Sequence, residues 1–371
     1  MGASATQALE VRMLALEMLP AQDGDCLLLE YGALETPHRI LIDAGRPETF
    51  EHLKARIEAL PRANRHFELF IVTHIDEDHI AGAIDLLEAR ESLGVTFGEV
   101  WFNGWQHLES VSRADDKLGG VAGERLTELL VEQRLPWNRR FASGAVVVPD
   151  TGPLPVHAFQ GLTLTVLTPS AKRLEQLMPE WEEAVIEAGL VPGRATARQL
   201  SAEDDRLGDP SFEALLEVPF EGDSSKPNAS SISVLAEYQG CRLLLGADAY
   251  PQDLLAALQR HAAPTQRLAL HAFKIPHHGS RKNIHVKLLQ KLSCTRFLVS
   301  TNGSRHKHPN REAIARVIQH GRATEERVEL FFNYETEFNK VWRNPGWMRE
   351  HRYTAHFPPE GQQGLRMVLM P

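Results

Sequence analysis

Four potential metal ligands stand close together in one short segment of the sequence. The segment follows an apolar run at 67–72 and precedes a helical pattern at 80–87. A loop held at both ends by regular structure can direct several side chains at one point. Histidine and aspartate together suit divalent zinc, manganese or iron. We therefore predict a metal site, and a solvated acidic turn is the alternative. The predicted ligands are His74, Asp76, Asp78 and His79.

Polar residues also follow apolar runs later in the chain. Asp248 comes after the run at 241–245, and His277 and His278 come after the run at 268–275. The ends of successive strands can converge at one edge of a sheet, so these residues are further site candidates. A carboxylate has two oxygens to share, so Asp248 could bridge two metals. The alternative is that Asp248 caps the next helix.

The two adjacent histidines point in opposite directions if the chain is extended there. One of them would then bind a metal, and the other would contact the substrate. We assign the metal to His278 and a catalytic role to His277, and the reverse assignment stays open. A plain turn before a helix that begins at Ser280 is the alternative for both.

Several other residues are candidates for contacts with the substrate or with the ligands. Asp43 ends an apolar strand-like run. Arg281, Lys282 and His306 could hold an anionic group, or they could belong to an ordinary charged surface. His308 fits a solvent-exposed basic loop as well as it fits a site.

The rest of the chain alternates between predicted strands and helices, which fit two layers of sheet with helices outside in a single domain, 1–371. Strands are predicted at 14–19, 26–31, 39–43, 67–72, 95–102, 145–148, 162–167, 231–237, 241–245, 268–275, 297–300 and 328–332. Helices are predicted at 49–60, 80–87, 107–135, 171–189, 251–261, 284–292 and 311–320. The polar stretch at 192–227 predicts an insertion near the site, and the residues after 333 form a C-terminal extension.

Composition and charge limit the classes of function. The 371 residues are 43% apolar and 24% charged, as in ordinary globular proteins. The net charge of −9 argues against a large nucleic-acid footprint, although divalent metals would add local positive charge. We see no signal peptide and no membrane-spanning run, which predicts a cytoplasmic protein without a membrane partner. The three cysteines are expected to be buried free thiols.

In this order, the motifs resemble the metallo-β-lactamase fold superfamily. The family pattern is His-x-His-x-Asp-His, and Asp76 stands here in place of the second histidine. This variant looks like the subgroup typified by the hydrolase domain of the competence protein ComEC. The matching motifs, from about Leu14 to about Val317, are His74-x-Asp76-x-Asp78-His79, Asn228-x-x-Ser231, Gly246-x-Asp248 and Pro276-His-His-Gly-Ser280.

The resemblance implies a four-layer αββα sandwich with two divalent metals at one edge of the sheets. It implies that His74 and Asp76 bind one metal and that Asp78 and His79 bind the other. Asp248 would bridge the two, and one histidine of the 277–278 pair would complete the ligand set of the second metal.

One departure from the family affects the choice of metal. Most of the superfamily supplies a further histidine to the first metal, and at the matching place this chain has Asn228. The first site is then richer in oxygen, which favours manganese or magnesium over zinc. Asn228 and Ser231 are candidates for contacts with the substrate or with the ligands.

We predict a hydrolase that uses a metal-bound hydroxide. Two metals suit in-line displacement at phosphorus, so a phosphodiester, and nucleic acid in particular, is the favoured substrate. Asp78 or Asp248 would orient the water, while Arg281, Lys282 or the free histidine would steady a phosphate. The alternatives are hydrolysis of a small ester, lactone, thioester or phosphocholine-type diester, and a non-catalytic metal-binding scaffold that serves a protein partner.

Overall fold

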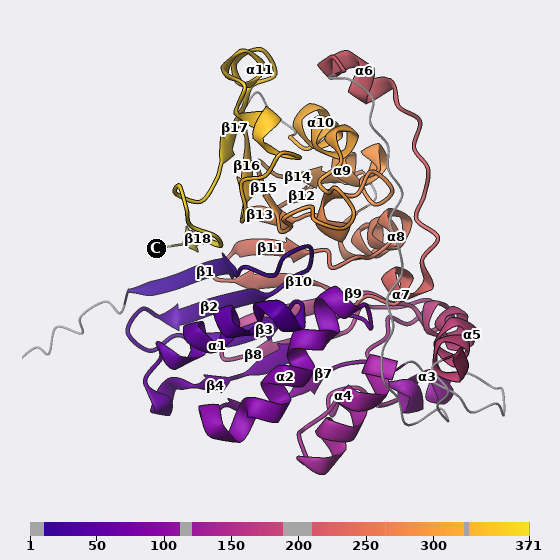
Figure 1. The fold of residues 1–371 in the computed structure, drawn as a ribbon. Coiled ribbons are helices and arrows are strands. Elements are labelled where there is room, and N and C mark those ends of the chain that lie inside the picture. Colours follow the sequence, from indigo (N-terminus) through magenta and orange to yellow (C-terminus); the bar gives the residue numbers. More distant parts are fainter. Residues whose placement is uncertain (1–10, 112–120, 188–209, 264, 323–325, 371) are drawn as a thin grey trace, which may run out of the picture.

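Two β-sheets pack face to face, and helices cover the outer face of each sheet (Figure 1). The computed structural model describes residues 11–111, 121–187, 210–263, 265–322 and 326–370. The predicted order of helices, sheet, sheet and helices is confirmed within this part of the chain.

The first sheet has six strands in the order β18-β1-β2-β3-β5-β7. Successive side chains of a strand point to opposite faces, and both faces of this sheet are covered. Leu14 and Leu16 of β1 therefore reach the core between the sheets, whereas Leu28 and Leu41 pack outward under the helices. The strands are β1 (Arg12–Met18), β2 (Leu27–Ala33), β3 (His38–Ile42), β5 (Leu69–Ile71), β7 (Val100–Trp101) and β18 (Leu365–Met370).

Helices cover the outer face of this first sheet (Figure 1). Buried residues such as Ile80 and Leu86 of α2 share one apolar cluster with Leu41 and Phe70 of the sheet. The helices on this side are α1 (Phe50–Glu58), α2 (Glu77–Leu93), α3 (Trp105–Val111), α4 (Val121–Glu132) and α5 (Ala171–Glu187). A short parallel pair, β4 (His66–Phe67) and β6 (Thr96–Phe97), lies beside the sheet.

The second sheet has eight strands in the order β17-β16-β15-β13-β11-β10-β9-β8. Its strands are β8 (Val156–Phe159), β9 (Leu162–Thr168), β10 (Ser233–Tyr238), β11 (Cys241–Leu245), β13 (Ala272–Lys274), β15 (Arg296–Val299), β16 (Val328–Phe332) and β17 (Tyr353–His356). The helices on this side are α8 (Pro251–His261), α9 (Val286–Lys291) and α10 (Arg311–His320). A parallel pair, β12 (Leu268–Ala269) and β14 (Leu292–Ser293), completes this half.

The strand predicted at 145–148 is wrong. Val148 forms only an isolated bridge with Ser170. The backbone of Val146 is instead satisfied by a side chain, because Asn103 donates to its carbonyl at 2.9 Å and accepts from its amide at 2.8 Å. Buried backbone groups need partners but not a neighbouring strand, so an apolar run can be core without being sheet.

Two regions that the sequence left vague have defined structure. After Asn333, a short helical stretch with α11 (Pro345–Glu350) leads to β17 and then to β18, which pairs antiparallel with β1. Of the stretch at 192–227, residues 192–209 lie outside the described residues. The rest holds α6 (Phe212–Glu217) and the start of α7 (Lys226–Ala229).

Two simpler expectations can be compared with the structure directly. Cys26, Cys241 and Cys294 are buried and free, as predicted. Among the helices of the described residues, none is both long and apolar enough to cross a membrane.

The pairing of β18 predicts a contrast between two neighbouring substitutions. Leu369 is 8% exposed and Val368 is 47% exposed. Leu369→Ala should lower the free energy of unfolding by about 2–4 kcal/mol, because it empties part of the core. Val368→Ala should change it by less than about 0.5 kcal/mol. Urea unfolding of both variants measures the difference, and equal effects would contradict the observed register.

Candidate metal centre

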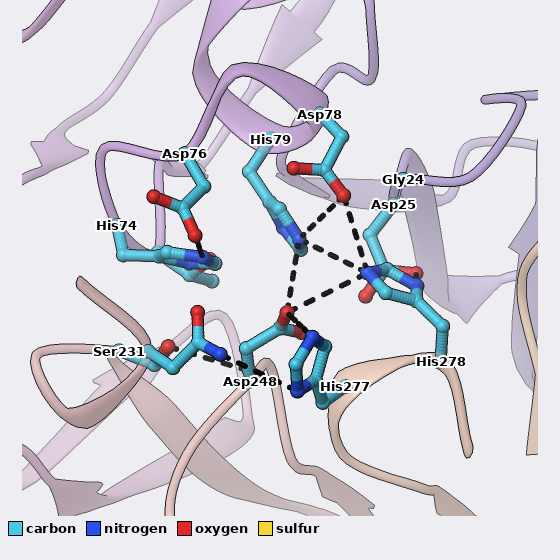
Figure 2. A network of polar contacts seen from close by, with 12 residues as sticks. Gly24, Asp25, His74, Asp76, Asp78, His79, Ser231, Asp248, His277 and His278 are labelled. Atoms are coloured by element: carbon cyan, nitrogen blue, oxygen red, sulfur yellow. Dashed lines mark hydrogen bonds and ion pairs between the residues drawn. The ribbon is translucent and has the colours of Figure 1, made fainter. Parts of the chain in front are cut away.

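The predicted ligands and Asp43 follow the carboxyl ends of four strands. Asp43 follows β3 and the segment 73–79 follows β5, and these two strands are parallel neighbours. Asp248 follows β11 and His277–Gly279 follows β13, which are also parallel neighbours. Parallel strands end at the same edge of a sheet, and the two sheets bring both edges together (Figure 2).

The close approach of His79 and His278 is the most compact part of the site. Their Nε2 atoms lie 3.2 Å apart. Asp78 Oδ2 lies 3.7 Å from the first nitrogen and 3.5 Å from the second. Asp248 Oδ2 lies 3.6 Å from each of them, from the opposite side (Figure 2). Both imidazoles are buried, so solvent does not separate these groups.

Hydrogen bonds at Nδ1 of each ring determine whether the two Nε2 atoms carry a proton or a lone pair. His79 Nδ1 donates to Asp43 Oδ2 at 2.8 Å, and His278 Nδ1 donates to the Ser300 carbonyl at 2.8 Å. A neutral imidazole with its proton on Nδ1 carries a lone pair on Nε2. Two lone pairs at this distance repel each other unless a cation lies between them. Asp78, His79 and His278 therefore fit a divalent metal ion.

The orientation and protonation of the His74 ring are set in the same way, through the Thr73 hydroxyl. The Thr73 hydroxyl donates to Asp43 Oδ2 at 2.7 Å, so it accepts from His74 Nδ1, which lies 3.0 Å away. His74 Nε2 is buried without a hydrogen-bond partner in the described part of the chain, and it lies 3.6 Å from Asp76 Oδ2. His74, His79 and Asp248 form a second group of potential ligands. Asp248 Oδ1 is also buried without a partner.

Asp43 acts as a support for the ligands. Oδ1 accepts from the Thr73 amide at 2.7 Å, and Oδ2 takes the Thr73 hydroxyl and the ring of His79. Both oxygens are thus already occupied. A hydrogen bond of this kind on the outer side of a histidine fixes the ring and makes it a stronger ligand.

Charge is concentrated at the centre. Burial favours neutral His278, but Asp248 and then Asp25 favour the imidazolium and raise its pKa to about 10. Burial likewise raises the pKa of the Asp248 carboxyl, but His278 and His79 outweigh it and hold that pKa well below its ordinary value. These shifts favour a protonated His278 beside an ionised Asp248 when no metal ion is bound.

Asp25 and Lys274 form a buried ion pair behind the centre, which the sequence analysis did not identify. Lys274 Nζ donates to Asp25 Oδ2 at 2.5 Å, and both side chains are almost fully buried. Asp25 Oδ1 lies 3.6 Å from His278 Nδ1. A Cβ on the preceding Gly24 would lie 1.8 Å from the Asp78 carbonyl oxygen, so only glycine lets this turn approach α2. In the sequence, residues 20–25 are only a short segment rich in Asp and Gly between two apolar runs.

His277 and His278 face different surroundings. The His277 side chain is 21% exposed and that of His278 is 3% exposed. His277 Nδ1 donates to Asn283 Oδ1 at 2.8 Å and lies 3.3 Å from Asp223 Oδ2. Its Nε2 lies 3.8 Å from Asp248 Oδ2. The structure therefore places His278 among the potential ligands and His277 at the more open side of the centre.

The backbone at the centre is held in an uncommon conformation. Asp43, Ala247, His277 and His278 all have φ angles between 44° and 54°. Non-glycine residues in this region carry strain, which surrounding contacts must sustain. No helix begins at Ser280, and α9 begins six residues later, at Val286. The expected helix start at Ser280 is therefore wrong, and His277–Gly279 form a single 3₁₀ turn.

The other predicted residues are distributed around the ligands. The Ser231 hydroxyl accepts from the Asp248 amide at 3.3 Å, while Asn228 Nδ2 donates to Asp223 at 2.7 Å. Arg281 lies 3.5 Å from Glu312 in an ion pair.

The remaining three candidates lie on the loop after His278 and on the loop after β15. Lys282 is exposed. His308 is buried, contrary to the exposed-loop alternative, and its ring centroid lies 5.1 Å from that of His277. His306 lies next to His308, with ring centroids 5.8 Å apart.

Glu77, within the ligand segment, connects three loops. Its Oε2 accepts from Arg46 at 2.5 Å and lies 3.3 Å from Arg305. The buried Arg46 also binds Asp23 through two hydrogen bonds, of 2.6 and 2.8 Å. Paired contacts of this kind fix geometry, so the loop that carries His306 is tied to the start of α2.

The sequence profile of the Metallo-beta-lactamase superfamily matches residues 23–293. The chain belongs to this superfamily. Its members are metal-dependent hydrolases, and the His and Asp groups described above could hold divalent ions. The matched range contains all six predicted ligands and both His277 and Asp223.

Solved structures with similar folds cover nearly the whole chain at low identity. The metallo-beta-lactamase fold protein YhfI from Bacillus subtilis is 9% identical, with a TM-score of 0.40, over 96% of this chain and 99% of that chain. A diphosphatase of the PhnP family is 8% identical, with a TM-score of 0.39, over 97% and 100%. Zn²⁺-bound PqqB from Methylobacterium extorquens is 15% identical, with a TM-score of 0.36, over 92% and 86%. No curated protein matches the chain.

The charge of the centre predicts that metal binding releases protons. At pH 7 His278 is protonated in the metal-free protein, because its pKa is raised to about 10. Metal must displace this proton, so metal affinity should rise as pH increases from 7 towards 10. Calorimetric titration in two buffers with different ionisation enthalpies should show release of about one proton or more per chain. His278→Ala should release fewer protons, and zero release by the unmodified protein would contradict the assignment.

Proposed function

We propose that the protein is a phosphodiesterase of the ComEC-like subgroup that uses two divalent ions, with nucleic acid as its favoured substrate. One observation carries this proposal. Two groups of potential ligands, one with His74 and Asp248 and the other with Asp78 and His278, share His79. Within the described residues, His74 Nε2 and Asp248 Oδ1 are buried without a hydrogen-bond partner. A pair of ligand groups in contact suits two metals, and two metals suit in-line displacement at phosphorus.

The ions would supply the Lewis acidity of the reaction. When bound, they would lower the pKa of a water molecule and neutralise charge on the phosphoryl oxygens. Asp78 and Asp248 provide carboxylate oxygens on opposite sides of the His79–His278 pair, where they can accept hydrogen bonds from an attacking water.

His277 is the side chain best placed to contact the substrate. Its Nδ1 proton is directed at Asn283, so the ring is fixed with Nε2 towards Asp248. Through Nε2 it can exchange a hydrogen bond or a proton with a phosphoryl or leaving-group oxygen. His308 packs edge-on against the His277 ring at 86°, which limits its rotation.

Donor groups beside the ligands support an anionic substrate. Arg305 lies beside Glu77 at the start of α2, and His306 follows it on the same loop. An arginine can bind two phosphate oxygens at once, and histidine donors add to the affinity for a phosphate group. A small ester or lactone would gain less from these groups than a phosphodiester.

Removal of either carboxylate at the centre should abolish hydrolysis. We expect Asp78→Ala and Asp248→Ala to reduce turnover of bis(p-nitrophenyl) phosphate by at least about a thousandfold while retaining the circular dichroism spectrum, because each loss disrupts a metal position. Glu91→Ala is the matched control, since this carboxylate is 88% exposed at the far end of α2. Unchanged turnover in either aspartate variant would refute the two-metal proposal.

A panel of substrates tests the choice of phosphodiester. The purified protein, loaded with Mn²⁺ or Zn²⁺, is assayed against plasmid DNA, single-stranded DNA, RNA, bis(p-nitrophenyl) phosphate, a lactone and a thioester. Cleavage of nucleic acid supports the nuclease proposal, and cleavage of only the small diester limits it to a phosphodiesterase. Hydrolysis confined to the lactone or thioester would refute it, and bound metal without hydrolysis of any substrate would favour a non-catalytic metal-binding scaffold.

A further inference from the structure

We infer that the buried carboxamide oxygen of Asn228 is a ligand for the divalent ion held by His74 and Asp76, and that Asp223 orients this carboxamide. The inference deepens the proposed function, because it concerns the same metal centre. It assigns a ligand to a position where the sequence suggested only a contact with the substrate or with other ligands.

The orientation of the Asn228 side chain is determined by Asp223. Asn228 Nδ2 donates to Asp223 Oδ2 at 2.7 Å, and a carboxylate can only accept. The opposite orientation of the amide would bring two oxygens to that distance, where they repel. The nitrogen must therefore face Asp223, and Oδ1 must face the other way.

The Asp223 carboxylate is itself held firmly. Its side chain is 7% exposed. Oδ1 accepts from the Ser225 amide at 3.0 Å, and Oδ2 also accepts from Asn283 Nδ2 at 3.1 Å. It cannot rotate to release Asn228 without losing these bonds, so it acts as a positioning residue.

Asn228 Oδ1 has no hydrogen-bond partner among the described residues, although the residue is only 3% exposed. Leaving a buried amide oxygen unsatisfied costs about 1–3 kcal/mol in general, so a partner outside the protein is expected. His74 Nε2 and Asp248 Oδ1 are likewise buried without a hydrogen-bond partner among the described residues. Three lone-pair atoms without a partner in one centre are what a cation position requires.

Contacts link these three atoms to one location. The Ile232 amide donates to the Thr73 carbonyl at 2.9 Å, which joins the end of the α7 segment to the residue before His74. Asn228 Nδ2 lies 3.3 Å from His277 Nδ1, and His277 Nε2 lies 3.8 Å from Asp248. The carboxamide therefore borders the side of the centre that His74 and Asp248 occupy.

The type of ligand indicates which metal this position prefers. A carboxamide oxygen is a hard, neutral ligand, and with Asp76 and Asp248 it makes the shell mostly oxygen. Manganese and magnesium favour such a shell, whereas zinc gains more from nitrogen. The second position, with His79 and His278, offers two nitrogens.

Metal counting tests the inference without any substrate. The full-length protein is stripped with a chelator, reloaded with Mn²⁺ and measured by equilibrium dialysis and electron paramagnetic resonance. We expect about two ions in the unmodified protein, as a two-metal site requires. Asn228→Leu keeps the approximate size of the side chain and removes its oxygen. It should lower the affinity for one of the two ions by at least about tenfold.

Two further variants separate ligation from folding. Ser225→Ala removes the hydroxyl that caps α7 and keeps the carboxamide, so it should still bind two ions. Asp223→Ala should lower the affinity for the same ion as Asn228→Leu does, because the carboxamide is no longer oriented. Full binding of both ions by Asn228→Leu would overturn the inference and show that a water satisfies Oδ1.

Asn228→His provides an independent measurement if Asn228→Leu fails to fold. An added imidazole should raise the ratio of Zn²⁺ to Mn²⁺ affinity at one position by at least about tenfold. An unchanged ratio would overturn the inference. Absence of metal from the unmodified protein would refute the metal centre and the proposed function together, whereas two ions in every variant would refute this inference alone.

Discussion

One buried carboxylate, that of Asp43, fixes the histidines on which the centre depends. It receives the Nδ1 proton of His79 directly and reaches His74 through the Thr73 hydroxyl. Both imidazoles therefore present Nε2 lone pairs to the same space. Asp43 itself has a φ of 54°, so the turn after β3 is strained where it delivers this group. The strain is sustained because α2 packs closely on the same turn: a Cβ on Gly82 would lie 2.1 Å from the Ala44 carbonyl oxygen.

The centre also depends on contacts between the two halves of the chain. The Ser300 carbonyl, after β15 of the second sheet, receives the Nδ1 proton of His278, while the Ser300 hydroxyl donates to the Gly24 carbonyl near the first sheet at 2.9 Å. Asn333 donates to the Leu19 carbonyl at 3.2 Å and accepts from the Thr301 amide at 2.9 Å. β18 then pairs with β1. Contacts between residues near the two ends of the chain thus hold Ser300, which in turn orients the ligand candidate His278.

Electrostatics explain why so many acidic groups can share one buried space. Asp25 is neutralised by Lys274, a buried ammonium that does not reach solvent. Among the residues that the structure describes, Asp78 and Asp248 have no lysine or arginine partner, and they face His79 and His278. Buried charges are costly unless they are paired, so these two carboxylates require protons or metal ions nearby. The Lys274 ammonium therefore neutralises Asp25 behind the centre, while exchangeable protons or metal ions neutralise Asp78 and Asp248 within it.

The sequence alone was sufficient to predict the layered fold, and it named the ligand candidates, because strand periodicity and the spacing of His74 to His79 are local properties. It could not show that Asp25, Lys274 and Asp223 border the centre, since Lys274 lies 249 residues from Asp25 and Asn283 lies 60 residues from Asp223. Nor could it separate His277 from His278, because a left-handed turn, not an extended strand, sets where each ring points. The tertiary structure decided these matters, because they depend on which loops the two sheet edges bring together.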